Sequence, residues 1–132
     1  MRSVPSGHVD ALWHLVGPQL QKAVDRFDDL SLDALRADII DRQKQLYVYA
    51  DEKMNIEWAM VTEIKINPKG RKIVVVALGG QNFLDSHLAE VVDFLRKWGE
   101  EIGASVEIPG REGWKRALKP FGGRVKYIVM EV

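Results

Sequence analysis

Residues 56–80 carry the pattern that most limits how this chain can fold. The stretch NIEWAMVTEIKI alternates in polarity, which predicts a strand with one face made of Ile56, Trp58, Met60, Thr62, Ile64 and Ile66. The segment NPKG at 67–70 predicts a turn, because proline presets one backbone dihedral angle and glycine permits another. The apolar run from Ile73 to Leu78 is typical of a strand covered on both faces. We therefore expect a hairpin over residues 56–79, with its second strand near the middle of a sheet.

The rest of the chain places helices and shorter strands around this hairpin. The clearest helix is predicted over 84–102, with an apolar stripe of Leu84, Leu88, Val91, Val92, Leu95, Trp98 and Ile102. Before the hairpin we expect an edge strand in the opening RSVP, a helix over 8–27 that is kinked or divided at Pro18, a helix capped by Ser31, and a strand at about 45–50. After residue 103 we expect a strand over 104–108, a short helix over 111–121 and a final strand over 124–132. This order predicts a single α+β domain over residues 1–132, with a mixed sheet that begins as an antiparallel meander.

Composition excludes several classes of function. The 132 residues include 19 basic and 19 acidic side chains, so non-specific electrostatic binding to nucleic acid is not expected. The chain has no cysteine, and its three histidines do not fall at metal-ligand spacing, so we expect no metal site. No apolar run is long enough to cross a membrane. Of the histidines, His87 alone is a candidate site residue, because it lies near the segment that joins the hairpin to the long helix. The alternative is that His87 is a surface or capping residue.

The order of these elements resembles that of the GNAT superfamily of N-acetyltransferases, and the stretch ALGGQNFLDSHL stands where that family has its cofactor loop, with Gly79 and Gly80 present but without the family's glycine spacing. In that family a loop of the form Gln/Arg-x-x-Gly-x-Gly/Ala opens the helix, and its backbone N–H groups hold the diphosphate of acetyl-CoA. The resemblance implies a cofactor site at Leu78, Gly79, Gly80, Gln81 and Asn82. It also implies a sheet that splays beyond the strand at 71–79, making a V-shaped cleft closed by the helix from about 84. The alternative is that the two glycines only allow the strand to turn into the helix.

The stretch REGWKRALKPFGG, at 111–123, covers a second GNAT motif, Asn-x-x-Ala-x-x-x-Tyr-x-x-x-Gly-Phe. In the family the tyrosine commonly protonates the departing thiolate of CoA, and Leu118 stands in its place here. The resemblance therefore leaves Tyr127 as a substitute proton donor. Glu63 lies on the strand where GNAT enzymes often place a general base. Its alternative role is that of a solvated side chain on the face opposite Trp58.

The same stretch, with VTEI at 61–64, also resembles the small GNAT-like proteins of tailed phages. That resemblance implies a non-catalytic or degenerate GNAT protein that acts in the virion, in morphogenesis or in protein contacts, located in the host cytoplasm or in the virion. Its partner would be a virion or host protein, contacted through Arg111, Trp114 and Lys115, and the edge of the final strand could pair with a second copy. The alternative function is an acetyl-CoA-dependent N-acyltransferase, which alone would require the cofactor acetyl-CoA.

Overall fold

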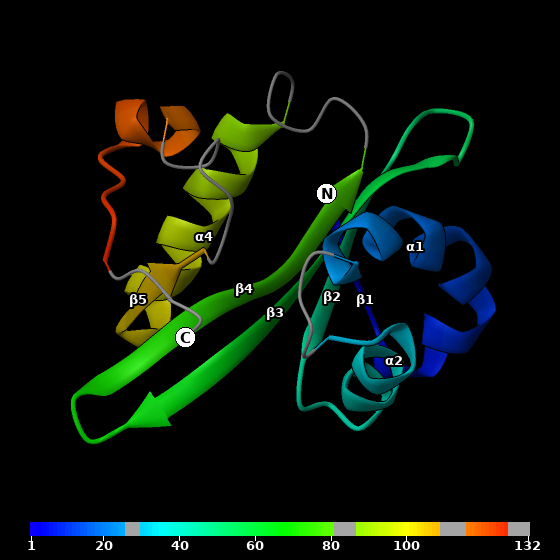
Figure 1. The fold of residues 1–132 in the computed structure, drawn as a ribbon, viewed down its shortest axis with the longest axis horizontal. Coiled ribbons are helices and arrows are strands. Elements are labelled where there is room, and N and C mark those ends of the chain that lie inside the picture. Colours follow the sequence, from blue (N-terminus) through cyan, green and yellow to red (C-terminus); the bar gives the residue numbers. More distant parts are fainter. Residues whose placement is uncertain (26–29, 81–86, 109–115, 127–132) are drawn as a thin grey trace.

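The chain folds around a five-stranded sheet with the strand order β1-β2-β3-β4-β5 (Figure 1). This computed structural model describes residues 1–25, 30–80, 87–108 and 116–126. The strands are β1 (Arg2–Val4), β2 (Gln45–Ala50), β3 (Ile56–Asn67), β4 (Gly70–Gly80) and β5 (Ala104–Glu107). The helices are α1 (Val9–Val24), α2 (Leu32–Ile40) and α4 (Leu88–Ile102), with short 3-10 turns η1 (Ser6–His8) and η2 (Lys119–Phe121).

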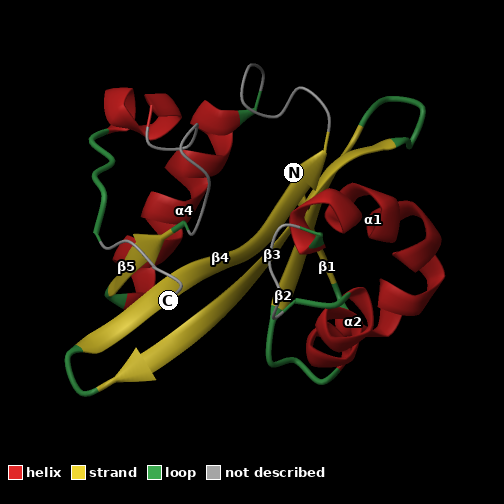
Figure 2. Cartoon of the chain, viewed as in Figure 1, coloured by secondary structure: helices red, strands yellow, loops and turns green. Residues whose placement is uncertain are grey.

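Neighbouring strands are antiparallel from β1 to β4, whereas β4 and β5 are parallel. Helix α4 connects these two parallel strands, which confirms the predicted mixed α+β sheet. Figure 2 shows α1 and α2 on one side of the sheet and α4 on the other. The long hairpin of β3 and β4 therefore has helices over both faces, as the apolar run from Ile73 to Leu78 indicated.

Two apolar cores lie on the two faces. The first joins α1 and α2 to the sheet and contains Val9, Val16, Leu20, Ala23, Val24, Leu35, Ile39, Leu46, Val48, Ala59, Val61 and Ala77. The second joins α4 to the sheet and contains Trp58, Met60, Ile73, Val75, Leu88, Val91, Val92 and Leu95. Each core buries the apolar stripe of its helices, which is the main source of their stability in water.

Local signals placed several boundaries correctly. The hydroxyl of Ser31 accepts a hydrogen bond from the Ala34 backbone N–H at 3.1 Å, so the predicted N-cap is confirmed. Gly103 ends α4 with φ +66°, in the left-handed conformation that glycine adopts without strain. Helix α1 is continuous through Pro18, so a division into two helices at that residue is wrong. Residues 124–126 have no strand assignment, and the remainder of the predicted final strand lies outside the described residues.

Two β-bulges decide which face of the sheet several side chains occupy. Val61 pairs with Ala77 and Thr62 pairs with Val75, so Val76 is an extra residue in β4. In β3, Trp58 pairs with Tyr49 and Ile56 pairs with Ala50, so Glu57 is the extra residue. As a result Ile56 packs against the α1 core while Trp58 packs against α4. The prediction that Ile56 and Trp58 share a face is wrong, because the bulge between them interrupts the alternation.

Candidate functional site

Strand β4 is paired with the parallel strand β5 over only part of its length. Their register runs from Arg71 opposite Ala104 to Val74 opposite Glu107. Strand β4 continues to Gly80, and no strand of the described ranges pairs with Val75–Gly80 on that edge. This stretch offers roughly 20 Å of extended backbone whose outward N–H and C=O groups need partners. Strand β5 ends at Glu107, opposite Val74, so pairing on this edge stops there and the predicted splay of the two strands stays a prediction.

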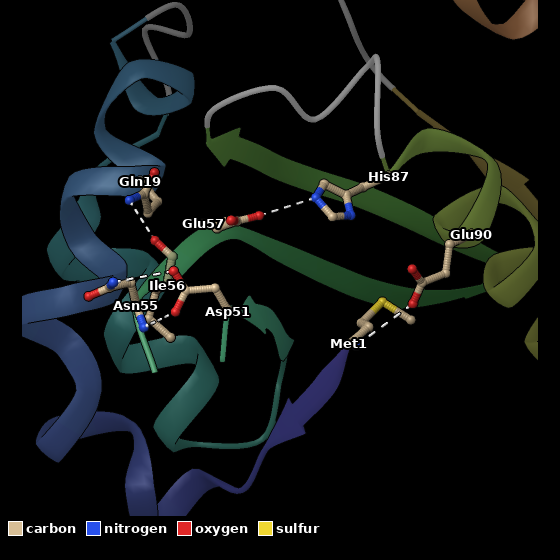
Figure 3. A network of polar contacts seen from close by, with 8 residues as sticks. All are labelled: Met1, Gln19, Asp51, Asn55, Ile56, Glu57, His87 and Glu90. Atoms are coloured by element: carbon tan, nitrogen blue, oxygen red, sulfur yellow. Dashed lines mark hydrogen bonds and ion pairs between the residues drawn. The ribbon is translucent and has the colours of Figure 1, made fainter. Parts of the chain in front are cut away.

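On the β3 side of β4, away from this free edge, a partly buried pair of side chains lies at the start of α4. His87 Nε2 lies 3.2 Å from Glu57 Oε2, and Figure 3 shows the two side chains pointing toward one another from α4 and β3. The His87 side chain is 11% exposed and that of Glu57 is 40% exposed. The ring of Tyr49 lies 4.3 Å from the His87 ring between centroids, and that of Trp58 lies 6.1 Å away. The bulge at Glu57 brings this carboxylate to the α4 side of the sheet.

Further polar contacts hold the neighbouring segments in place (Figure 3). The side-chain amide of Gln19 on α1 donates to the Ile56 carbonyl at 3.0 Å, which ties α1 to the start of β3. In the loop before β3, the Asp51 carboxylate accepts hydrogen bonds from the backbone N–H groups of Lys53 and Asn55. The bond from the Asn55 backbone is the main reason that the pKa of Asp51 is lowered. On α4, Glu90 lies 3.7 Å from the N-terminal ammonium of Met1.

At the Val75 end of the free edge, where β5 ends, two carboxylates flank Val74. Glu63 on β3 and Glu107 on β5 are both opposite Val74 in the sheet register, which places them on one face. Glu107 accepts a hydrogen bond from Lys126 and lies 3.3 Å from the Lys72 ammonium. The bond from Lys126, with further contributions from Lys72, lowers the pKa of Glu107. Glu63 is half-buried, and no hydrogen bond or ion pair joins it to another residue in the described part of the chain.

The alternation of β3 puts Glu63 on the face opposite Trp58 and Met60, as the sequence indicated. Its prediction as a general base is not tested by this placement. Glu63 pairs with Val74, the last residue of β4 that is paired with β5, and this position is compatible with that role. The alternative prediction, that Glu63 is a solvated side chain, agrees only partly with the structure, because this side chain is half-buried.

The two glycines of the predicted cofactor loop have clear packing roles. A Cβ atom on Gly79 would lie 1.8 Å from the Gln19 carbonyl oxygen, so only glycine allows α1 to approach β4 this closely. A Cβ atom on Gly80 would lie 2.4 Å from the Trp58 Cβ, and its φ of +153° also favours glycine. Leu78 is partly buried against the α4 core. These contacts explain both glycines without a ligand and leave the backbone of β4 available at its free edge.

The remaining predicted site residues divide into two groups. Gln81, Asn82, Arg111, Trp114, Lys115 and Tyr127 lie outside the described residues. Leu118 is described: it packs against the α4 core, and Gly123 approaches it so closely that a Cβ would lie 2.6 Å from the Leu118 Cβ. Leu118 is therefore a packing residue that has no proton to donate.

Sequence reasoning missed Glu57. Strict alternation assigns Glu57 to the face opposite Trp58, and no local signal in NIEWA marks the bulge. The position of His87 near the predicted loop does mark it as a candidate, but its partner lies 30 residues away in the sequence. Within the described ranges, no cluster of three or more acidic or histidine side chains could hold a metal ion. No helix in the same ranges is long and apolar enough to span a membrane.

The residues around the free edge fit a coenzyme A thioester. That molecule carries amide groups along an extended arm and a diphosphate at one end. The unpaired edge of β4 can exchange hydrogen bonds with amides, in the manner of an added strand. The adjoining N-terminus of α4 offers backbone N–H donors and the positive end of a helix dipole.

No protein-family model matches the sequence, and no curated protein matches it. Solved structures with the same fold are nevertheless numerous. One is a predicted acetyltransferase with acetyl-CoA from Clostridium acetobutylicum, with a TM-score of 0.69, 13% identity and coverage of 99% of this chain and 93% of that chain. A second is the glucosamine-6-phosphate N-acetyltransferase of Arabidopsis thaliana, with a TM-score of 0.67, 17% identity and coverage of 99% and 95%. A third is an acetyltransferase of Trypanosoma brucei, with a TM-score of 0.64, 14% identity and coverage of 99% and 96%.

These similarities extend over nearly the whole chain and agree with the observed strand order. At this level of identity they establish the architecture and leave the reaction open. The chain has the GNAT fold, the fold of the acyl-CoA N-acyltransferases.

Proposed function

We propose that this protein is an acyl-CoA-dependent N-acyltransferase, with the CoA thioester lying along the free edge of β4. The observation that carries the proposal is that β5 ends at Glu107, opposite Val74, which leaves Val75–Gly80 unpaired on that side among the described strands. The same fold in a neighbour described with acetyl-CoA supports it. When bound, the cofactor would supply an acyl group activated as a thioester.

The surroundings of the two ends of the free edge differ, and they indicate which part of the CoA thioester would lie at each end. The Gly80 end adjoins the N-terminus of α4, where unpaired N–H groups and the helix dipole favour the diphosphate. The Val75 end adjoins Glu63, Val74 and Glu107. We therefore place the acyl group and the amine acceptor at the Val75 end, where a carboxylate could accept a proton from the amine.

The two carboxylates at this end differ in their surroundings. Lys126 and Lys72 both contact Glu107, and they keep it ionised and weakly basic, as its lowered pKa indicates. Glu63 has no such cation against it among the described residues. Of the two, Glu63 is the better proton acceptor for an incoming ammonium group, so we assign it the role of general base.

One observation favours a second function. Leu118, at the position of the family's tyrosine, is packed against α4 and cannot protonate a leaving thiolate. A protein with this fold but without catalysis would act by contact with another protein, for example as a virion or morphogenesis component. Arg111, Trp114 and Lys115 remain the predicted contact residues for that case.

Calorimetric titration with acetyl-CoA separates the two functions. The enzyme is expected to bind with micromolar affinity and to release CoA thiol, measured with a chromogenic disulfide, when primary amines are supplied. In that assay Glu63→Gln should leave the affinity for acetyl-CoA unchanged and lower kcat/KM by about 100-fold. Glu101→Gln, at an exposed position on α4, is the matched control and should change neither quantity. Absence of acetyl-CoA binding by the unmodified protein would overturn the proposal and favour the contact function.

A further inference from the structure

We propose that the amine acceptor carries an anionic group, a carboxylate or a phosphate, on the order of 7 Å from its reactive nitrogen, and that Lys65 and Lys72 bind this group. This inference rests on the proposed function and names the class of acceptor that the same site would take. Its structural basis is a strip of charged side chains on one face of the sheet, between the Val75 end of the free edge and the turn that joins β3 to β4.

The sheet register places the charged side chains of this strip on the same face. Glu63 pairs with Val74, and Lys65 pairs with Lys72 directly opposite. On β5, Glu107 also pairs with Val74, and its carboxylate lies 3.3 Å from the Lys72 ammonium, so both strands present these side chains on one side. The four charged side chains therefore form a strip that crosses β3, β4 and β5.

The strip lies beyond the part of its face that α1 and α2 cover. Ile64, between Glu63 and Lys65, packs in the α4 core, so the strip is on the α1 side of the sheet. The hairpin residues in the α1 core all lie nearer the Gly80 end of the sheet: Ile56, Ala59, Val61, Val76 and Ala77. Figure 2 shows the turn between β3 and β4 extending away from α1 and α2. Lys65 is exposed and Lys72 is half-buried, so both side chains can reach a small molecule on this face.

The charges of the strip favour an anion beside Lys65. Lys72 and Lys126 both contact Glu107, which offsets part of their charge. Like charges directly opposite one another in a sheet are destabilising, and Lys65 lies opposite Lys72 without a hydrogen bond or ion pair of its own in the described part of the chain. Among the described residues of the strip and its ion pairs, three ammonium groups accompany the carboxylates of Glu63 and Glu107. An acceptor ammonium at Glu63 adds another positive charge, which an anionic group on the same molecule would offset.

The spacing along β3 determines the length of the acceptor. Residues two apart on a strand lie roughly 7 Å from each other, and this is the separation of Glu63 and Lys65 along β3. An amine that gives its proton to Glu63 would place its anionic group beside Lys65 if the two groups are separated by about the same distance. A carboxylate or phosphate there would accept a charge-assisted hydrogen bond from the lysine ammonium. An alkylamine without an anionic group lacks this contact and should be a poorer acceptor.

The experiment compares two acceptors that differ in one charge, 6-aminohexanoate and 6-aminohexanamide, with the full chain and saturating acetyl-CoA. Release of CoA thiol gives kcat and KM for each acceptor. We expect kcat/KM to be about 10-fold higher for 6-aminohexanoate, mainly through a lower KM, because the contact with Lys65 forms in the ground state and in the transition state alike. The preference should fall as the salt concentration rises from about 0.05 M to about 0.5 M, because the exposed charge of Lys65 is screened.

Two substitutions at Lys65 and one control test the assignment. Lys65→Gln should reduce the preference to about 2-fold by raising the KM for 6-aminohexanoate, since Lys72 remains, whereas Lys65→Arg should retain most of it. The control is Lys53→Gln, at an exposed lysine in the loop before β3 and at the other end of the hairpin, which should keep the full preference.

The outcomes separate this inference from the proposed function. Equal kcat/KM for the two acceptors in the unmodified protein would overturn the inference and leave the proposed function intact. A full preference that persists in Lys65→Gln would overturn it in the same way. Turnover of neither acceptor would also overturn the inference, and absence of acetyl-CoA binding would overturn the proposed function with it. The comparison of acceptors needs no variant, so it holds even if a substitution impairs folding.

Discussion

Replacing Gly79 by alanine should destabilise this protein far more than an added methyl group usually does. Gly79 lies near the end of β4, directly under α1. The new Cβ would fall 1.8 Å from the Gln19 carbonyl oxygen, 2.9 Å from the Gln19 carbonyl carbon and 3.4 Å from the Leu20 Cα. All three are backbone atoms of a helix, so no side-chain rotation can relieve the overlap. The helix as a whole has to move away from the sheet.

The cost can be assembled from two effects. Moving a packed helix to admit an extra methyl group costs typically 1–3 kcal/mol and occasionally more, and the overlap here is at the severe end, so about 3 kcal/mol is expected. The same movement strains the hydrogen bond from the Gln19 side chain to the Ile56 carbonyl, which lies 3.0 Å away. Its loss adds about 1 kcal/mol. We therefore expect Gly79→Ala to lower the free energy of unfolding by about 3–4 kcal/mol.

Urea denaturation followed by tryptophan fluorescence measures this change in the absence of any ligand. The matched control is Gly7→Ala in η1, where no atom lies within 4 Å of the new Cβ, and its effect should stay within about 0.5 kcal/mol. The reasoning fails if Gly79→Ala is as stable as the control. A stable variant that had lost CoA binding would show that Gly79 is present for a ligand, as the family resemblance implies, and not for packing.

Other substitutions test separate parts of the structure. Met54 has φ +65° and is exposed, so Met54→Gly should raise the free energy of unfolding by about 1 kcal/mol in urea titrations, and a decrease would contradict the observed backbone conformation. Because the pKa of Glu107 is lowered in the folded state, its ion pairs stabilise the protein above the ordinary carboxyl pKa and lose that effect as pH falls through the lowered value. Thermal melts should therefore show less acid sensitivity for Glu107→Gln than for the unmodified chain, and equal sensitivity would argue against the two lysine contacts. Thr62 is fully buried and its hydroxyl donates to the Gln45 side-chain carbonyl at 2.9 Å, so Thr62→Val should cost about 1 kcal/mol in the same urea assay, and a gain in stability would count against the bond.

Features encoded by neighbouring residues could be predicted from the sequence. The alternation of 56–66 and the turn at 67–70 predicted the hairpin of β3 and β4, and the apolar stripe of 88–102 predicted α4. Ser31 predicted the start of α2, because a capping hydroxyl acts within one helical turn. The order of these elements was enough to indicate the GNAT fold. In each case the signal and its structural consequence lie within a few residues of each other.

Other features depended on contacts between distant segments, and only the tertiary structure decided them. The bulge at Glu57 depends on how β3 pairs with β2, and it both moves Ile56 to the α1 core and turns Glu57 toward His87. The sequence indicates a ligand or a turn for Gly79, but its neighbour is the backbone of α1, about sixty residues earlier in the chain. The free edge of β4 exists because β5 ends at Glu107, opposite Val74, and the pairing of these two residues is not recorded in the local pattern of either strand. The periodicity of the sequence determines which residues form strands and helices. The register of paired strands and the close approach of a helix to a strand depend on the packing of segments that meet only when the chain folds.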